Sequence, residues 1–217
     1  MDNALIEINS EEVPIMDGSA KNFIDIIKNT ELKTLPIKRK YLKVINKFEF
    51  MDGKRKISIE PNSDTFSVEF ELDYQNKLIG KQKNNVDFQK DNLDEIIESR
   101  TFCLYEDIEK IKKIGLAKGG SLENAIVVDK NKVLNEGGLR NQKEFVNHKI
   151  LDLAGDFVLS GYRIIGKVKC HQGGHELSNL FLKNFLEKNE NFSFVELNNE
   201  YSTKLFGKNF TQLAVNA

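Results

Sequence analysis

Residues 144–156 read Glu-Phe-Val-Asn-His-Lys-Ile-Leu-Asp-Leu-Ala-Gly-Asp, and the rest of the chain is organised around this stretch. Every fourth residue is ionisable, and on a helix this spacing gathers them into one polar stripe of Glu144, His148, Asp152 and Asp156. The pattern predicts a helix over residues 142–159 whose polar stripe points away from the core. Its other face has the apolar spacing of a helix packed on a core, at Val146, Ile150, Leu153, Ala154 and Phe157.

The bulk composition is that of an ordinary globular protein. The chain has 217 residues, 40% of them hydrophobic, which is enough for one large domain or two small ones. A net charge of -1 gives no indication of a nucleic-acid partner or of binding to an anionic membrane. No apolar run is long enough for a signal peptide or a transmembrane segment, so we expect a soluble, cytoplasmic protein. Cys103 and Cys170 lie far apart in no CxxC pattern, which favours reduced thiols and leaves a single disulfide open.

Local patterns predict an α+β chain in two parts. Residues 4–8 are strand-like and residues 20–28 have helical periodicity. A linker at 32–40 follows directly, so this first part of the chain has too few elements for a domain and resembles the end of one. Asp52-Gly53 is a tight-turn signal that predicts a hairpin at the start of the second part. In that part we expect strands at 44–50, 56–59, 66–74, 125–129, 164–170 and 194–197, and helices at 92–99, 106–114 and 175–187.

The predicted helix over 142–159 carries a possible metal-binding pair. His148 and Asp152 are one helical turn apart, which suits a nitrogen and an oxygen ligand of zinc, although such a pair is often only a solvated contact. His175 follows a glycine pair at a loop-to-helix junction, where side chains commonly converge on ligands. Asp156 could hold the His175 ring as a general acid, or could simply pair with Lys149.

Other chemistries find less support in the sequence. The glycines between His171 and His175 argue against a second metal pair on one helical turn. Lys118-Gly119-Gly120-Ser121 lacks the spacing of a phosphate-binding loop, which favours a flexible connection. No serine lies in a G-x-S-x-G turn, and neither cysteine has neighbours that would activate a thiolate.

Taken together and in order, several segments resemble the UDP-3-O-acyl-N-acetylglucosamine deacetylases, the zinc enzymes of the committed step of lipid A synthesis in Gram-negative bacteria. The resemblance covers nearly the whole chain. It rests on Asp2-Asn3-Ala4, Pro14-Ile15-Met16-Asp17-Gly18-Ser19-Ala20, Ser99-Arg100-Thr101-Phe102, Gly119-Gly120-Ser121, Ala125-Ile126-Val127-Val128, Val133-Leu134-Asn135-Glu136, Gly138-Leu139-Arg140, Phe145-Val146-x-His148-Lys149-x-Leu151-Asp152-x-x-Gly155-Asp156 and Gly174-His175-x-Leu177-x-Asn179.

The resemblance implies roles for individual residues. His148 and Asp152 would be zinc ligands, and His175 would be the general acid that protonates the leaving amine. Lys149 and Asp156 would be polar groups of the active site, and Thr101 would help to stabilise the oxyanion. The substrate, an acylated UDP-N-acetylglucosamine, would contact Phe102, Leu104, Ile108, Ile111, Leu116, Gly120, Ser121 and Ala125, some of which would line an apolar passage for the acyl chain and are equally compatible with a core role.

The resemblance also implies a fold of tandem β-α-α-β domains, each a two-layer sandwich of sheet and helices. Residues 1–35 would be the end of the first domain, and 40–200 the complete second domain with a βαβ insert at about 102–127, followed by a tail at 201–217. The family's general-base glutamate and first zinc histidine form a Glu-His pair, and no Glu-His dipeptide occurs in this sequence.

We therefore expect the chain to be a C-terminal portion of such an enzyme that binds zinc poorly and is close to inactive alone. An unpaired first strand would leave the N-terminal region disordered or prone to aggregation. Two alternatives stay open. The chain could be a non-catalytic protein that binds the UDP-sugar and acyl groups, or one half of a split enzyme completed by a separate chain.

Overall fold

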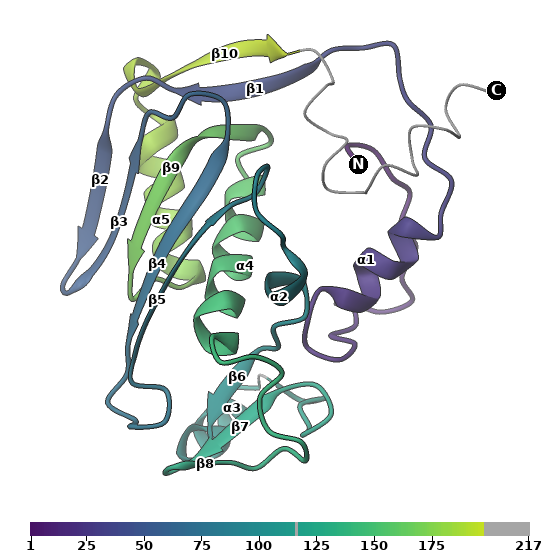
Figure 1. Ribbon diagram of the computed structural model, residues 1–217, viewed down its shortest axis with the longest axis vertical. Helices are drawn as coiled ribbons and strands as arrows, with labels where there is room; N and C mark the ends of the chain where they lie inside the picture. Colours follow the sequence, from purple (N-terminus) through teal and green to yellow (C-terminus); the bar gives the residue numbers. More distant parts are fainter. Residues whose placement is uncertain (116, 198–217) are drawn as a thin grey trace.

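The computed structural model describes residues 1–115 and 117–197 (Figure 1). Leu116 and the tail at 201–217, for which the sequence suggested roles, lie outside the described residues. The described part is α+β, as predicted, because one mixed sheet is covered on one face by two long helices (Figure 1). These helices are α4 (Glu144–Val158) and α5 (His175–Leu186).

The large sheet is built around strand β9 (Arg163–His171). The first residues of β9 pair in parallel with β1, while the remainder pairs with antiparallel β3 on one side and with parallel β4 on the other. The hairpins β2–β3 and β4–β5 extend the sheet, and β10 pairs with β1 at one edge of the sheet. The strands are β1 (Arg39–Val44), β2 (Phe48–Asp52), β3 (Arg55–Glu60), β4 (Phe66–Asp73), β5 (Lys81–Asp87) and β10 (Phe192–Leu197), with a short 3-10 turn η2 (Asn189–Asn191) before the last.

A three-stranded sheet lies at one end of the molecule, at the bottom of Figure 1. It pairs β6 (Phe102–Leu104) with β7 (Ile126–Asp129) in parallel and β7 with β8 (Lys132–Val133). Between β6 and β7 the chain forms η1 (Tyr105–Asp107) and the short helix α3 (Ile108–Lys113). A β-α-β unit therefore follows directly after the Ser-Arg-Thr segment of residues 99–101, which we call the SRT loop.

The core lies between the large sheet and the two helices. Val146, Ile150, Leu153 and Phe157 of α4 are buried there, as the periodicity predicted, whereas Ala154 is only half-buried. Phenylalanine rings from α4, α5 and β2 form a connected cluster at Phe48, Phe157, Phe181 and Phe185. Burial of such rings is the main source of stability in a core of this kind.

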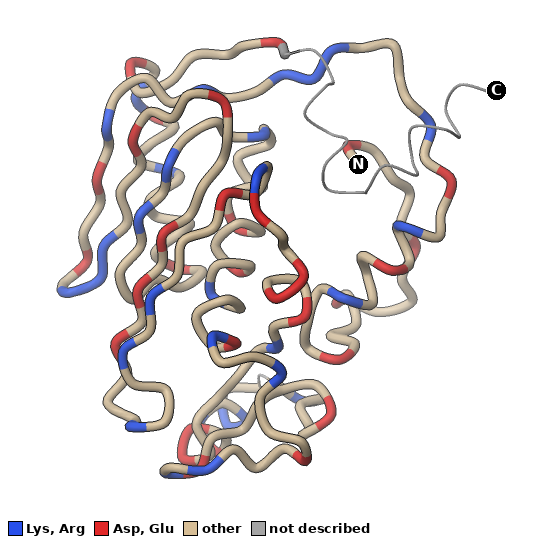
Figure 2. Tube along the Cα trace, viewed as in Figure 1, with Lys and Arg blue, Asp and Glu red and all other residues tan. Residues whose placement is uncertain are grey.

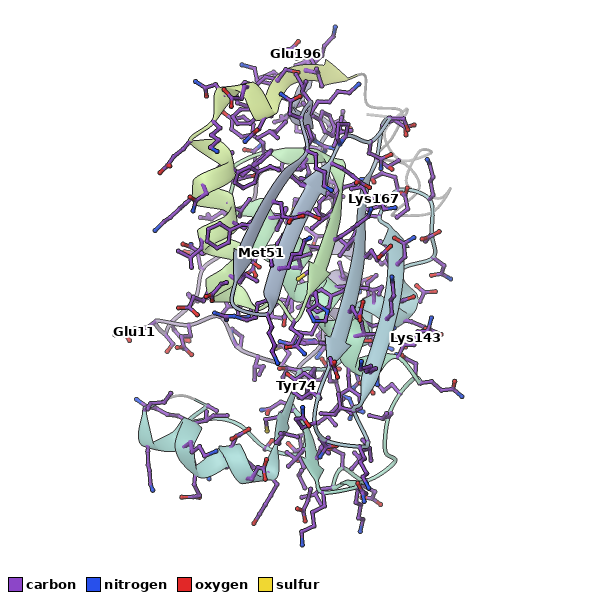
Figure 3. The ribbon with its side chains drawn as sticks, turned by 90° about the vertical axis from the view of Figure 1, so that its left-hand side faces the viewer. Glu11, Met51, Tyr74, Lys143, Lys167 and Glu196 are labelled. Carbon is purple, nitrogen blue, oxygen red and sulfur yellow. The ribbon has the colours of Figure 1, made fainter. Side chains whose placement is uncertain are left out.

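The opposite face of the large sheet carries charged side chains, and within the described residues no helix covers it (Figure 3). Neighbouring strands pair these charges: Lys56 with Glu49, Lys169 with Glu60, and Lys83 with Glu69. Figure 2 shows that basic and acidic residues are interspersed along the chain, in keeping with its balanced net charge. None of the helices in the described ranges is long and apolar enough to cross a membrane.

Several predicted boundaries were wrong. Residues 4–8 form no strand, because no strand of the described chain lies beside them, and their apolar side chains remain exposed, Leu5 most of all at 88%. The strand expected at 44–50 is interrupted after Val44, where the chain leaves β1 and begins β2. The helix expected at 92–99 is the short α2 (Asp94–Ile97), while α1 (Lys21–Lys28) and the turn at Gly53, with φ of +60°, agree with the predictions. Strands β1, β5 and β8 were not predicted, and β1 begins inside the linker expected at 32–40.

Candidate active site

The polar stripe of α4 faces the protein rather than solvent. Glu144 is fully buried and His148 is only 8% exposed, so this end of the stripe, which was expected to point away from the core, is covered by another part of the chain. The covering element is the SRT loop, which lies against the first two turns of α4. A short-range pattern could not predict this contact, because the loop and the helix are more than 40 residues apart in sequence.

His148 lies between two hydrogen-bond acceptors. Its Nδ1 is 3.1 Å from the carbonyl oxygen of Ser99, and its Nε2 is 3.2 Å from Oδ1 of Asp152. Since a carbonyl oxygen only accepts, Nδ1 must carry a proton and donate it to Ser99. In that tautomer Nε2 is the ring nitrogen that carries the free lone pair, and it faces the Asp152 carboxylate. The pair thus presents one nitrogen and one oxygen donor of the kinds that zinc binds.

Asp152 is the second donor of this pair, and Lys149 balances its charge. Burial would raise the pKa of the Asp152 carboxyl, but the hydrogen bonds and charges of His148 and Lys149 outweigh that effect and hold the pKa below its usual range. Lys149 Nζ donates to Asp152 Oδ2 at 2.9 Å and lies 5.5 Å from the centre of the Phe102 ring. Asp152 is therefore a carboxylate at neutral pH, as a metal ligand must be.

Asp156 pairs with His175 and not with Lys149. The distance from His175 Nδ1 to Asp156 Oδ1 is 2.8 Å, so the carboxylate fixes the ring by its Nδ1 proton and leaves Nε2 free. The side chain of His175 is 71% exposed, at the first residue of α5, after Gly174. The other oxygen of Asp156, Oδ2, is buried and has no hydrogen-bond partner among the described residues. An exposed, oriented imidazole of this kind is suited to proton transfer.

The SRT loop is fixed from several sides by backbone hydrogen bonds. The Thr101 amide donates to Gly18 O at 2.8 Å, and the Thr101 carbonyl accepts from Ile126 N at 2.7 Å. Thr101 is thus held between the turn that precedes α1 and the first residue of β7. It lies beside Phe102, whose ring packs edge-on against Phe145 of α4.

The residues expected to contact substrate lie mainly in the β6–α3–β7 unit, and their exposure varies. Phe102, Leu104, Ile108, Ile111 and Ala125 are half-buried, whereas Gly120 and Ser121 are exposed on the connection between α3 and β7. Half-buried apolar side chains of this kind are compatible with both a passage wall and the edge of a core.

A cavity of about 580 Å³ opens where the large sheet meets the small one. Tyr74, labelled in Figure 3, lies at this junction. Among the predicted substrate contacts, the walls include Leu104 only. The cavity is mixed in character and reaches the loop before His175, with a lining of Leu72, Asp73, Tyr74, Gln75, Asn76, Leu104, Glu106, Gln172 and Gly173.

No cluster of three or more histidine, cysteine, aspartate or glutamate side chains lies close enough to hold a metal ion in the described residues. The zinc-type donors therefore amount to the His148–Asp152 pair in this part of the chain. Both cysteines are free, and burial raises the pKa of the Cys170 thiol to about 12. That thiol stays protonated at neutral pH, which agrees with the expectation that neither cysteine is an activated nucleophile.

Asn135 was quoted as part of a motif, but its structural role could not be read from the sequence. It is 6% exposed, accepts a hydrogen bond from Val127 N at 2.9 Å, and donates to the carbonyls of Leu122 and Ala125, each at 2.7 Å. One amide side chain thus ties the start of β7 to the connection that precedes it.

Replacing Asn135 by leucine is expected to destabilise the small sheet by about 3 kcal/mol, because three hydrogen bonds are lost and a buried backbone amide is left unpaired. Urea unfolding followed by the near-ultraviolet signal of the aromatic residues measures the change. The matched control is Asn131→Ala in the exposed β7–β8 turn, which should change the stability by less than about 0.5 kcal/mol. Equal effects of the two substitutions would contradict the role assigned to Asn135.

Comparisons with known proteins agree with the resemblance. Residues 1–187 match the family model "LpxC: UDP-3-O-acyl N-acetylglycosamine deacetylase". The UDP-3-O-acyl-N-acetylglucosamine deacetylase of a Nitratiruptor species is 39% identical over 90% of this chain and 66% of its own length. The proteins of that name from Geotalea uraniireducens and Campylobacter jejuni subsp. jejuni are 40% and 37% identical over 91% of this chain. The chain spans 64% to 67% of the length of these curated relatives.

Proposed function

Because the chain belongs to the family of UDP-3-O-acyl-N-acetylglucosamine deacetylases, we propose that it carries part of the active site for zinc-dependent removal of the acetyl group from an acylated UDP-N-acetylglucosamine, the committed step of lipid A synthesis. The observation that carries the proposal is the His148–Asp152 pair. Its Nε2-to-carboxylate gap of 3.2 Å and its Nδ1 hydrogen bond to Ser99 together suit a metal ligand with a fixed tautomer.

His148 and Asp152 would hold the zinc ion. When bound, zinc polarises the acetyl carbonyl and makes a water molecule more acidic. Around that ion, Lys149 keeps Asp152 in its charged form through the 2.9 Å hydrogen bond, and Thr101 would stabilise the negative charge that develops on the carbonyl oxygen. The loop that presents Thr101 is fixed by backbone hydrogen bonds on both sides, which suits a preorganised contact.

His175 would donate a proton from Nε2 to the amine nitrogen of the sugar as the bond to the acetyl carbon breaks. The products are then acetate and the free amine. The hydrogen bond from Nδ1 to Asp156 supports this role, since the carboxylate orients the ring and leaves Nε2 available. Exposure of the His175 side chain leaves room for a substrate to approach the free ring nitrogen.

We also propose where the two ends of the substrate lie. The half-buried apolar residues of the β6–α3–β7 unit would contact the acyl chain, and the cavity beside Tyr74 and Gln172 would take a polar part of the UDP-sugar. In this proposal residues 1–35 and 40–200 belong to different domains of the enzyme, which acts in the cytoplasm.

Two protein donors are fewer than the three found in catalytic zinc sites, and the sequence contains no Glu-His pair to supply a histidine ligand and a general base. We therefore propose that this polypeptide alone binds zinc weakly and turns over slowly, since loss of general-base assistance alone costs about 10²- to 10⁴-fold in rate. A separate chain that supplied the missing groups would restore both properties.

Acetate release from an acylated UDP-N-acetylglucosamine tests this proposal. The chain should be close to inactive alone and should gain activity and stoichiometric zinc when mixed with the remaining third of the Nitratiruptor relative. In the mixture, His148→Ala and Asp152→Ala should each lose zinc, while Lys169→Ala on the opposite sheet face should change nothing. Stoichiometric zinc and full activity in the chain alone would show that the site is complete without further groups.

The second candidate is a non-catalytic protein that binds the nucleotide sugar and its acyl chain. A pair of only two zinc-type donors in the described residues, together with the cavity beside Tyr74, favours it. Calorimetry decides between the two functions: substrate binding that is unchanged by chelators, together with no activity in any mixture, supports the binding protein.

A further inference from the structure

Glu144, at the start of α4, is a buried carboxylate with four hydrogen-bond donors. Oε1 accepts from the Arg100 backbone amide at 3.1 Å and from Arg100 Nε at 2.8 Å. Oε2 accepts from Arg100 Nη2 at 3.2 Å and from the Arg140 backbone amide at 2.6 Å. The Glu144 side chain is 0% exposed and that of Arg100 is 9% exposed, so both charges are removed from solvent. A buried charge is tolerated only with such complete pairing.

Other contacts fix the SRT loop on both sides of Arg100. Arg100 Nη2 also donates to Gly138 O at 2.8 Å, and Arg140 Nη1 donates to Glu98 O at 2.9 Å. The residue between Glu98 and Arg100 is Ser99, whose carbonyl accepts the Nδ1 proton of His148. Glu144 and His148 are separated by one turn of α4. The Glu144 side chain therefore holds the SRT loop at Arg100, and the Ser99 carbonyl of the same loop holds the His148 ring.

We propose that Glu144 is a positioning residue that sets the orientation and tautomer of the His148 ring through Arg100 and the Ser99 carbonyl. The proposal rests on the proposed function in that the ring it orients is a zinc ligand. Ser99 lies directly beside Arg100, so the bond from the Arg100 backbone amide to Glu144 limits how far the Ser99 carbonyl can rotate. The same bond restrains the other neighbour, Thr101, to which the proposed function assigns stabilisation of the oxyanion.

The ion pair of Arg100 with Glu144 is suited to positioning the SRT loop because its geometry is specific. The Arg100 side chain and backbone amide reach one carboxylate together, which determines both the side-chain direction and the peptide plane of the loop. A neutral amide in place of Glu144 would keep one acceptor but would place N–H groups against donors. The SRT loop would then lose its single preferred position.

The experiment uses the metal-free 217-residue chain with 15N-labelled histidine. In the parent, the His148 Nδ1 proton should exchange slowly with water because it is buried and bonded to Ser99. In Glu144→Gln we expect its exchange to be at least about ten-fold faster, with His171 and His175 unchanged as internal references. The control is Glu60→Gln, which removes a carboxylate from an ion pair on the exposed sheet face and should leave all three rings unchanged.

Should Glu144→Gln fail to fold, the double variant Arg100→Met with Glu144→Leu decides the matter, because replacing a buried ion pair by apolar residues is often tolerated. Faster exchange at His148 in this folded variant supports the proposal. Exchange at the parent rate in either folded variant overturns it, as does a parent chain in which the His148 Nδ1 proton is already unprotected. These readouts need neither zinc nor turnover, so a failure of the deacetylase function would leave them unchanged.

Discussion

Alanine in place of Gly18 is expected to release the turn before α1 from the SRT loop and to raise hydrogen exchange at the Thr101 amide by about 10²-fold. Gly18 has a φ of +83°, and a Cβ built there would lie 2.0 Å from the backbone oxygen of Asn124. Backbone atoms cannot yield as a flexible side chain does, so the turn has to move away. The movement breaks the 2.8 Å hydrogen bond from Thr101 N to Gly18 O.

The magnitude follows from two costs. A non-glycine residue at positive φ costs about 1–3 kcal/mol, and the steric overlap adds to that cost, so local opening becomes easier by roughly 3 kcal/mol. Each 1.4 kcal/mol corresponds to about ten-fold in an opening equilibrium. Exchange measured by mass spectrometry or NMR at Thr101 reports this opening without requiring enzyme activity.

Gly53 provides the matched control. It also has a positive φ, +60°, but a Cβ there would meet nothing within 4 Å. Gly53→Ala therefore carries the conformational cost without the overlap and should loosen only the β2–β3 turn. Equal protection of the Thr101 amide in the two variants would show that Gly18 does not dock the turn on the small sheet.

The sequence was most informative where structure depends on local periodicity. The apolar spacing of α4 predicted its core residues, and the Asp-Gly pair predicted the turn at Gly53, because helix faces and tight turns depend on a few adjacent residues. Spacing also placed His148 and Asp152 on one helix face, where the structure has them 3.2 Å apart.

Contacts distant in sequence could not be read from these patterns. Residues 4–8 have strand-like composition, but a strand needs a partner, and none of the described strands lies beside them. Glu144 was recognised only as a member of the polar stripe, because nothing in the residues around it reveals the pairing with Arg100. Asn135 is a similar case, since its three partners depend on how the connection before β7 folds back.

The roles of the site residues depend on the resemblance more than on their spacing. Spacing left open whether Asp156 pairs with Lys149 or with His175. In the structure Asp156 pairs with His175. The geometry of an oriented, exposed imidazole is consistent with a general acid, yet the same geometry would suit a simple surface ion pair. Only a kinetic experiment separates these two roles.

In the active mixture of this chain with the complementing segment, His175→Ala is expected to lower kcat by about 10²- to 10⁴-fold, the usual contribution of a positioned general acid. Zinc content should stay stoichiometric, because the proposed ligands His148 and Asp152 lie on α4 whereas His175 begins α5 and contacts Asp156. Steady-state kinetics with metal analysis of the same samples measures both quantities. Asp156→Asn should lower kcat by a smaller factor, because it weakens the orientation of the ring without removing the acid.

His171→Ala is the control for this experiment. His171 also lies beside a carboxylate, Glu71 at 3.8 Å, but at the end of β9, and it has no assigned role in the site. This variant should retain the parent kcat. If His175→Ala instead releases zinc, the ring acts as a ligand and not as a proton donor; if it keeps the parent rate, the contact with Asp156 is a surface ion pair. Each result thus assigns a different chemical role to the same 2.8 Å contact.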